Sequence, residues 1–80
     1  MDKNIHTDDQ GKLADMLKEA RTAAGLTQAQ LSEKIGVPQS FVSKYESGER
    51  RLDVLELRTV CRALGVSLSA FVNRLDKELS

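Results

Sequence analysis

Apolar residues recur along most of this chain at the spacing of amphipathic α-helices, and glycines separate the segments in which they do so. The first segment can be capped by Thr7 or Asp8, and it ends at Gly25. Its apolar positions recur at helical steps of three and four residues: Leu13, Met16, Leu17, Ala20 and Ala24. We therefore expect a long first helix, preceded by a flexible N-terminal tail over residues 1–7.

Two shorter helices are expected between residues 27 and 48, joined by a tight turn. Thr27 can cap the first of them, and Gln30, three residues later, completes a capping box. Gly36 can adopt the left-handed conformation that ends a helix, and Pro38 suits the start of the next one. A helix, a short turn containing glycine and a second helix form the arrangement of a DNA-binding helix-turn-helix.

Two further helices are expected after this motif. Asp53 and Glu56 have the spacing of another capping box, for a helix that runs to about Leu64, and Ser67 can cap a fifth helix. The apolar stripe of the fourth helix consists of Leu57, Val60, Cys61 and Leu64. That of the fifth helix consists of Phe71, Val72, Leu75 and Leu79. The sequence thus predicts an all-α fold, a compact bundle of about five helices formed by residues 8–80.

The second helix of the motif has one apolar and one polar face. Val42 and Tyr45 project to the same side and are expected to be buried. The opposite arc holds amides, hydroxyls and an amine, and no carboxylate: Gln39, Ser40, Ser43, Lys44 and Ser47. Such groups can hydrogen-bond to base edges and phosphates. A polar helix face is most often only a solvated surface, so it is the adjacent turn that favours contact with DNA.

The net charge neither marks nor excludes a nucleic-acid-binding chain. Twelve basic and twelve acidic residues cancel over the 80 positions, whereas such chains usually have a basic excess. Residues 21–51 hold five basic and three acidic residues, and residues 1–20 hold three basic and five acidic ones. The middle of the chain is therefore mildly basic, which predicts modest affinity for DNA unless two copies act together.

Composition and the few reactive side chains argue against an enzyme. The chain has 40% hydrophobic and 30% charged residues, one histidine and one cysteine, as expected of one small globular domain. His6 has no cluster of metal-ligating residues near it, and Cys61 falls on the apolar stripe of the fourth helix, where it is interpreted as a core residue. We expect no catalytic residue, metal, cofactor or small-molecule ligand. One cysteine, no secretory signal and no membrane span favour a cytoplasmic protein.

Taken in order, these residues resemble the Cro/C1-type (XRE) helix-turn-helix family of phage and bacterial transcriptional regulators. The resemblance extends from about Leu13 to Leu75. It depends on Arg21, Gly25-Leu26-Thr27-Gln28, Leu31, Ile35-Gly36-Val37, Gln39-Ser40, Val42-Ser43-Lys44-Tyr45-Glu46, Gly48 and Leu64-Gly65-Val66-Ser67. It implies a lambda-repressor-like bundle of five helices, with the second helix of the motif in the DNA major groove.

The resemblance also implies roles for individual residues. The positions that face the bases are Gln39, Ser40, Ser43 and Lys44. Those that meet the DNA backbone are Gln28, Ser47, Arg50 and Arg51. Gln28 is further expected to brace Gln39, and Arg21 and Glu46 match a pair that forms a salt bridge between the first and third helices. For Arg51, a role in solubility is an equally good explanation.

Two positions depart from the family pattern or extend it. Position 38 is often Ser or Thr in such domains, and Pro38 removes that capping hydroxyl. Phe41 flanks the polar face, where its ring can contact a thymine methyl or a sugar, or cover the turn.

The function expected is that of a sequence-specific transcriptional regulator that binds double-stranded DNA as a homodimer, at a pseudo-palindromic operator. It would act as a repressor by blocking polymerase at a promoter, or as an activator by contacting it. The expected dimer surface is the stripe of the fifth helix, Phe71, Val72, Leu75 and Leu79. The alternative is an antitoxin or protein-interaction module whose bundle mainly holds a partner protein. The apolar fifth helix and the zero net charge support that alternative.

Overall fold

The computed structural model describes residues 2–80, with side chains described from Asp8 onward. This part of the chain forms helices and no strand, as the sequence predicts. The helices are α1 (Asp2–Ala23), α2 (Gln28–Ile35), α3 (Gln39–Glu46), α4 (Val54–Ala63) and α5 (Leu68–Leu79). The predicted all-α bundle of five helices is confirmed.

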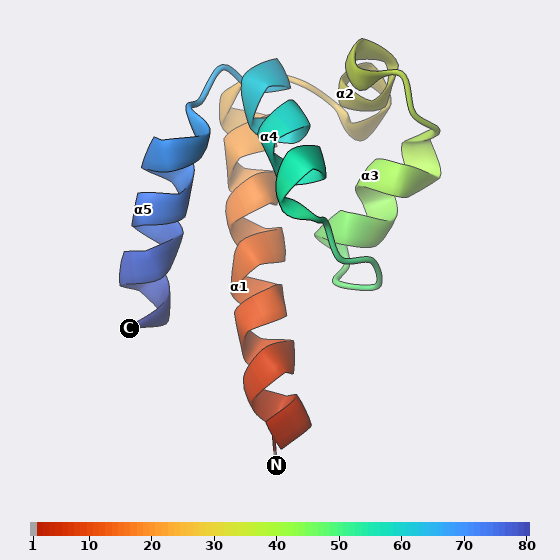
Figure 1. The fold of residues 1–80 in the computed structure, drawn as a ribbon. Helices are drawn as coiled ribbons and strands as arrows, with labels where there is room; N and C mark the ends of the chain where they lie inside the picture. The colour runs from red at the N-terminus through yellow and green to blue at the C-terminus, as the bar shows by residue number, and fades with distance from the viewer. Residues whose placement is uncertain (1) are drawn as a thin grey trace.

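Helix α1 is the long axis around which the other helices are arranged (Figure 1). Helix α5 runs antiparallel to α1 along one side, and α2 and α3 lie on the other side. Helix α3 packs against α1 and α2, whereas α4 packs against α2 and α5. The helix-turn-helix therefore stands at one edge of the bundle.

Helix α1 begins earlier than the sequence pattern predicts. It starts at Asp2, so the predicted start at Thr7 or Asp8 is wrong. Residues 2–10 contain neither proline nor glycine, so nothing in the backbone interrupts the helix there. Two predictions are not tested by the structure: the flexibility of the tail at residues 1–7 and the surface position of His6. Both lie outside the residues whose side chains the structure describes, which begin at Asp8.

Local capping signals set most of the other helix boundaries. At α2, Thr27 Oγ1 accepts a hydrogen bond from the Gln30 amide at 3.0 Å, and Gln30 Oε1 accepts one from the Thr27 amide at 2.9 Å. Asp53 and Glu56 form the same reciprocal pair at α4, at 2.7 and 2.9 Å. Both predicted capping boxes are therefore present, and each satisfies two backbone donors that the helix itself cannot.

A single aliphatic and aromatic core joins all five helices. Its buried members are Met16, Leu17, Leu31, Val42, Tyr45, Leu57, Val60, Cys61, Leu64 and Phe71. Cys61 is fully buried, as its place on the apolar stripe predicts, and burial raises the pKa of its thiol. Val42 and Tyr45 bury the inner face of α3, which directs the polar face outward.

The apolar stripe of α5 is divided between the core and the surface. Phe71 is buried in the core and Leu75 packs against it, while Val72 and Leu79 are exposed. Positions 71 and 75 are four residues apart and share the inner face, and positions 72 and 79 are seven apart and share another. The expectation that Phe71 lies at a dimer surface is therefore wrong, because its ring is already covered within one chain.

None of the described helices is both long enough and apolar enough to span a membrane.

Candidate nucleic-acid interface

The turn between α2 and α3 has the short, fixed geometry that the motif needs. Gly36 adopts the left-handed conformation with φ of 75°, which residues with a Cβ rarely adopt. The Val37 amide then donates to Ser32 O at 3.0 Å and closes the end of α2. Pro38 is extended, with φ of −64° and ψ of 152°, and precedes α3 without offering a side-chain cap. These three residues set the angle between the two helices.

The outward face of α3 presents the polar groups that the sequence predicts. Gln39, Ser40, Lys44 and Ser47 are exposed, and Ser43 is half-buried. The Ser43 and Ser47 hydroxyls donate to Ser40 O and Lys44 O at 3.3 and 3.0 Å, and Ser47 Oγ also accepts from the Glu49 amide at 3.4 Å. Each hydroxyl oxygen has two lone pairs, so both keep acceptor capacity. The structure thus brings all five predicted polar residues of this helix onto one side.

An ion pair buried between α1 and α3 holds the C-terminal end of α3. Arg21 Nε and Nη2 donate to the Glu46 carboxylate at 2.7 and 3.1 Å, a bidentate contact. Their side chains are only 10% and 3% exposed, and the hydrogen bond to Glu46 raises the pKa of Arg21. Arg21 Nη1 also donates to Leu26 O at 2.8 Å. The predicted pair is present, and it fixes α3 relative to α1 and the start of the motif.

Gln28 has a different partner from the one expected. Its Nε2 donates to Glu46 Oε1 at 3.0 Å, so it joins the buried ion pair and does not brace Gln39. Because the Glu46 carboxylate is charged and shielded from water, it attracts this amide more strongly than a neutral side chain would.

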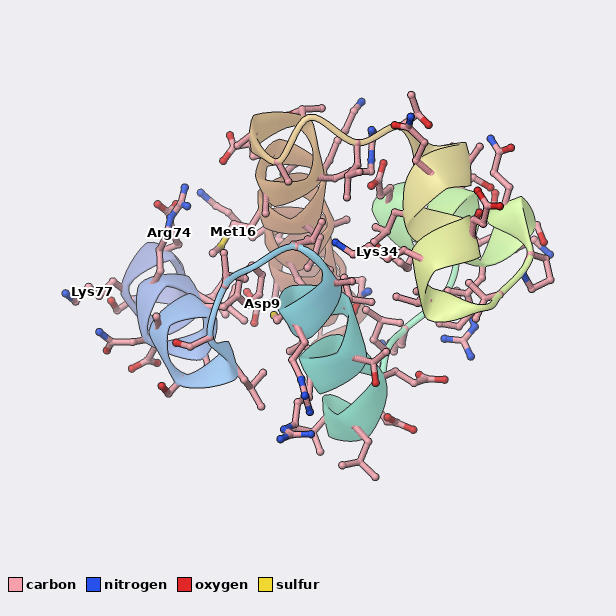
Figure 2. The ribbon with its side chains drawn as sticks, turned by 90° about the horizontal axis from the view of Figure 1, so that it is seen from above. Asp9, Met16, Lys34, Arg74 and Lys77 are labelled. Atoms are coloured by element: carbon pink, nitrogen blue, oxygen red, sulfur yellow. The ribbon has the colours of Figure 1, made fainter. Side chains whose placement is uncertain are left out.

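Lys34 makes a contact that the sequence pattern does not reveal. Its Nζ donates to Ala63 O, at the end of α4, at 2.9 Å. In Figure 2, the exposed Lys34 extends from α2 toward the end of α4, whereas Lys77 points away from the bundle on α5. A cation on the last carbonyls of a helix is favourable, and this one ties α2 to α4.

Phe41 and Arg50 form a stacked pair beside the exposed face of α3. The Arg50 guanidinium carbon lies 4.3 Å from the centroid of the Phe41 ring. Phe41 is half-buried and meets Tyr45 edge-on, with ring centroids 5.8 Å apart. The ring therefore lies against the side of the motif rather than fully in the core.

Arg50, expected at the DNA backbone, is engaged within the protein. Its Nη2 and Nη1 donate to the Glu56 carboxylate at 2.9 and 3.2 Å, and Nη1 also donates to Arg51 O at 2.8 Å. The hydrogen bonds between Arg50 and Glu56 raise the pKa of Arg50 and, with that from the Asp53 amide, lower the pKa of Glu56. The sequence pattern predicts only a capping role for Glu56. Its spacing of six residues from Arg50, across a short loop, is the signal that could have found the pair.

The remaining cations of the interface are unengaged. Among the described residues, neither the Lys44 amine nor the Arg51 guanidinium has a hydrogen-bonding or ionic partner, and both residues are exposed. The same part of the chain holds no group of His, Cys, Asp and Glu side chains that could bind a metal ion.

A second surface lies on α5, away from the motif. Val72 and Leu79 are 41% and 39% exposed and border a shallow hollow of about 460 Å³. Its other lining residues are Ser69, Asn73, Leu75 and Asp76. The lining thus combines three apolar side chains with three polar ones.

Comparison with known proteins agrees with this geometry. Residues 17–71 match the helix-turn-helix family. An XRE-family like protein from Pseudomonas syringae pv. tomato str. DC3000 is 47% identical, with 95% of this chain and 93% of that one covered and a TM-score of 0.88. The restriction-modification controller protein C.Esp1396I, solved as a tetramer with its natural 35 base-pair operator, is 28% identical, with coverage of 89% and 93% and a TM-score of 0.79.

A curated relative is the cryptic phage CTXphi transcriptional repressor RstR of Vibrio cholerae serotype O1, which is 33% identical over 63 residues. That match covers 79% of this chain, which spans 56% of the relative's length. The fold and the matched residues define a DNA-binding regulator and not a class of enzyme. The chain belongs to the helix-turn-helix family of the XRE, or Cro/C1, type, and is a transcriptional regulator of that family.

Proposed function

We propose that this chain regulates transcription in the cytoplasm by binding a pseudo-palindromic site in double-stranded DNA as a homodimer. The observation that carries the proposal is the outward face of α3, which holds amide, hydroxyl and amine groups and follows a tight, rigid turn. An exposed helix of this kind fits the major groove, where each base pair presents a distinct set of donors and acceptors.

The exposed side chains of α3 are suited to contact bases. Gln39 offers a donor and an acceptor together, which matches adenine, and Lys44 offers a donor for guanine. Ser40 and Ser43 are short and add contacts close to the helix. We assign these four residues to base recognition, and Phe41, which borders them, to apolar contact with a thymine methyl or a sugar.

Contacts to phosphates would set the position of the protein on the duplex. Lys44 and Arg51 supply unengaged positive charge, and Ser47 a hydroxyl. Pro38 offers no side-chain acceptor to the first turn of α3, so backbone amides there are available to a phosphate. Gln28 is engaged by Glu46, so its contribution would be to hold α2 and α3 together at the DNA backbone.

A second copy would double these few contacts. The net charge of zero gives one chain little general attraction to DNA, and two chains bound to half-sites about one helical turn apart would combine their affinity. The exposed Val72 and Leu79 on α5, with the half-buried Leu75, form the surface we assign to this dimer. The C.Esp1396I relative, solved as a tetramer with its operator, supports assembly of this kind.

Selection of binding sites from random DNA, followed by a gel shift on the selected site, tests the proposal. We expect a site with two inverted half-sites, and affinity that falls steeply with salt. Lys44→Ala is expected to weaken binding to the selected site by about tenfold, while Lys18→Ala, an exposed lysine on α1 outside the interface, leaves it unchanged. Failure to select any site, or equal binding by Lys44→Ala and the parent chain, would refute it.

A further inference from the structure

Arg50 is surrounded by partners on several sides, unlike the other cations near α3. The Glu56 carboxylate binds two of its nitrogens, the Arg51 carbonyl accepts a further bond, and its planar group lies over the Phe41 ring. Both N–H groups of Nη1 are thereby used. A guanidinium held in this way has a fixed position, in contrast to a flexible side chain that follows a phosphate.

Phe41 packs against the edge of the core and borders open space on two sides. It lines a hollow of about 490 Å³ together with Ser40, Lys44 and Arg50. It also lines a smaller hollow of about 140 Å³ together with Glu56, Thr59 and Val60 of α4. Because close packing is what normally fixes a side chain, the contacts with Tyr45 and Arg50 help to fix the ring where it borders these hollows.

Helices α3 and α4 share the apolar core, in which Val42 and Tyr45 belong to the same cluster as Val60 and Cys61; a further contact between them, outside that core, runs through Arg50. Helix α3 packs against α1 and α2, and the Arg21–Glu46 pair holds it on the α1 side. Outside the core, the Phe41 ring of α3 contacts Arg50, and Arg50 forms an ion pair with Glu56 of α4. Glu56 is itself fixed at the start of α4 by the capping box with Asp53.

We propose that Arg50 is a positioning residue for DNA recognition: held by Glu56 and stacked on Phe41, it sets the position of α3 relative to α4. This inference rests on the proposed function and deepens it. Arg50 acts through Phe41 on the residues of α3 that face the bases, and the loop's contact with phosphate falls to Arg51.

The proposal can be tested by the direction in which DNA affinity changes when the negative charge of Glu56 is removed. Replacing Glu56 with Gln makes the chain more positive by one charge, and added positive charge by itself strengthens binding to DNA. The replacement also frees Arg50 from its carboxylate, which would strengthen binding further if Arg50 were a phosphate contact. A positioning role predicts weaker binding instead, because α3 loses its contact with α4 through Arg50.

The experiment compares Glu56→Gln with Asp53→Asn in the same gel shift on the selected site. Both variants change the charge equally at the start of α4, and both keep the capping box, since Gln suits its third position and Asn its first. Only Glu56→Gln removes the carboxylate that binds Arg50. Arg50→Lys is the third variant, because it keeps the cation but loses the bidentate contact and the stacking.

We expect Glu56→Gln and Arg50→Lys each to bind the selected site about tenfold more weakly than the parent chain. Asp53→Asn should bind at least as tightly as the parent. Binding to unrelated DNA and the salt dependence of binding should stay unchanged in Arg50→Lys, so the ratio of specific to non-specific affinity falls. The double variant should be no weaker than Arg50→Lys alone, since both changes remove one contact.

Circular dichroism at the assay temperature verifies that each variant compared is folded, so that a loss of DNA affinity cannot be caused by unfolding. If Glu56→Gln binds as tightly as Asp53→Asn, or Arg50→Lys as tightly as the parent chain, the positioning role is overturned while the proposed function stands. If the parent chain itself selects no DNA, the proposed function fails and this inference fails with it.

Discussion

At the scale of single residues, the buried Arg21–Glu46 pair is one contact that fixes the position of α3. Taking two charges out of water is costly, and good geometry with further hydrogen bonds is needed to offset that cost. Here Arg21 also binds the Leu26 carbonyl, and Glu46 also accepts from Gln28. The pair therefore joins α1, α2 and α3 at one point, and loss of either partner would leave a buried charge unsatisfied.

We predict that Arg21→Met lowers the free energy of unfolding by about 3 kcal/mol, which for a domain of this size lowers Tm by roughly 15 °C. Methionine keeps most of the side-chain volume but leaves Glu46 without its cation. Arg74→Met is the control, since Arg74 pairs with Glu19 at 3.3 Å on the surface, where both side chains are more than half exposed. That change should cost less than ~0.5 kcal/mol. Thermal denaturation followed by circular dichroism measures both, and equal effects would show that burial of the pair contributes nothing.

The partners of long polar side chains are the part of the site that the sequence predicts least well. Arg21 and Glu46 were paired through the family resemblance, and they do pair. The resemblance predicts that Gln28 meets the DNA backbone and braces Gln39, and that Arg50 meets the DNA backbone. It contains no sign that, within the chain, Gln28 binds Glu46 and Arg50 binds Glu56. Several acceptors lie within reach of such side chains, and the choice depends on burial and on charges from other helices, which no local pattern contains.

At the scale of elements, the boundaries that depend on local chemistry are predicted well. Thr27, Gly36 and Asp53 act within one turn of their own position, so their spacing in the sequence is sufficient to place α2 and α4. The start of α1 is predicted poorly because no such local signal marks it. Residues with only moderate helix preference give no local signal that the helix stops, and capping residues such as Thr7 can also lie inside a helix.

Two glycines in different elements should respond oppositely to one substitution. Gly36→Ala places a Cβ on a residue with φ of 75°, so we expect a loss of about 1 kcal/mol in the free energy of unfolding. Gly11 lies inside α1 with open space around it, so Gly11→Ala should gain about 0.5–1 kcal/mol. Urea denaturation of both variants checks the signs. A gain at Gly36 would contradict the left-handed turn.

At the scale of the whole molecule, the sequence predicts the number and order of helices but not which side of α5 is covered. All four members of its stripe are apolar, so only the position of α1 and α4 beside it decides that Phe71 is buried and Val72 exposed. Periodicity locates an apolar face to within a few side chains. The division between core and subunit surface is a property of the assembled bundle.

We predict that the double variant Val72→Gln and Leu79→Gln is monomeric at micromolar concentrations, at which we expect the parent chain to be the proposed dimer. The two changes remove exposed apolar surface from α5 without adding charge. Analytical ultracentrifugation measures the association state, and weaker binding to a two-half-site operator should accompany the change. Ala23→Gln, on an exposed position at the end of α1, is the control and should remain dimeric. A double variant that sediments as the parent does would place the dimer surface elsewhere.

Because Cys61 is buried, the reactivity of its thiol can be used to measure the stability of the protein. Cys61 is the only cysteine in the chain, it is 0% exposed, and burial raises the pKa of its thiol. A thiol-specific reagent would therefore label the protein only when the core opens, and the labelling rate would follow the population of open molecules. Since a ligand that binds only the folded state lowers that population, the same thiol could register DNA binding without any added label on the protein.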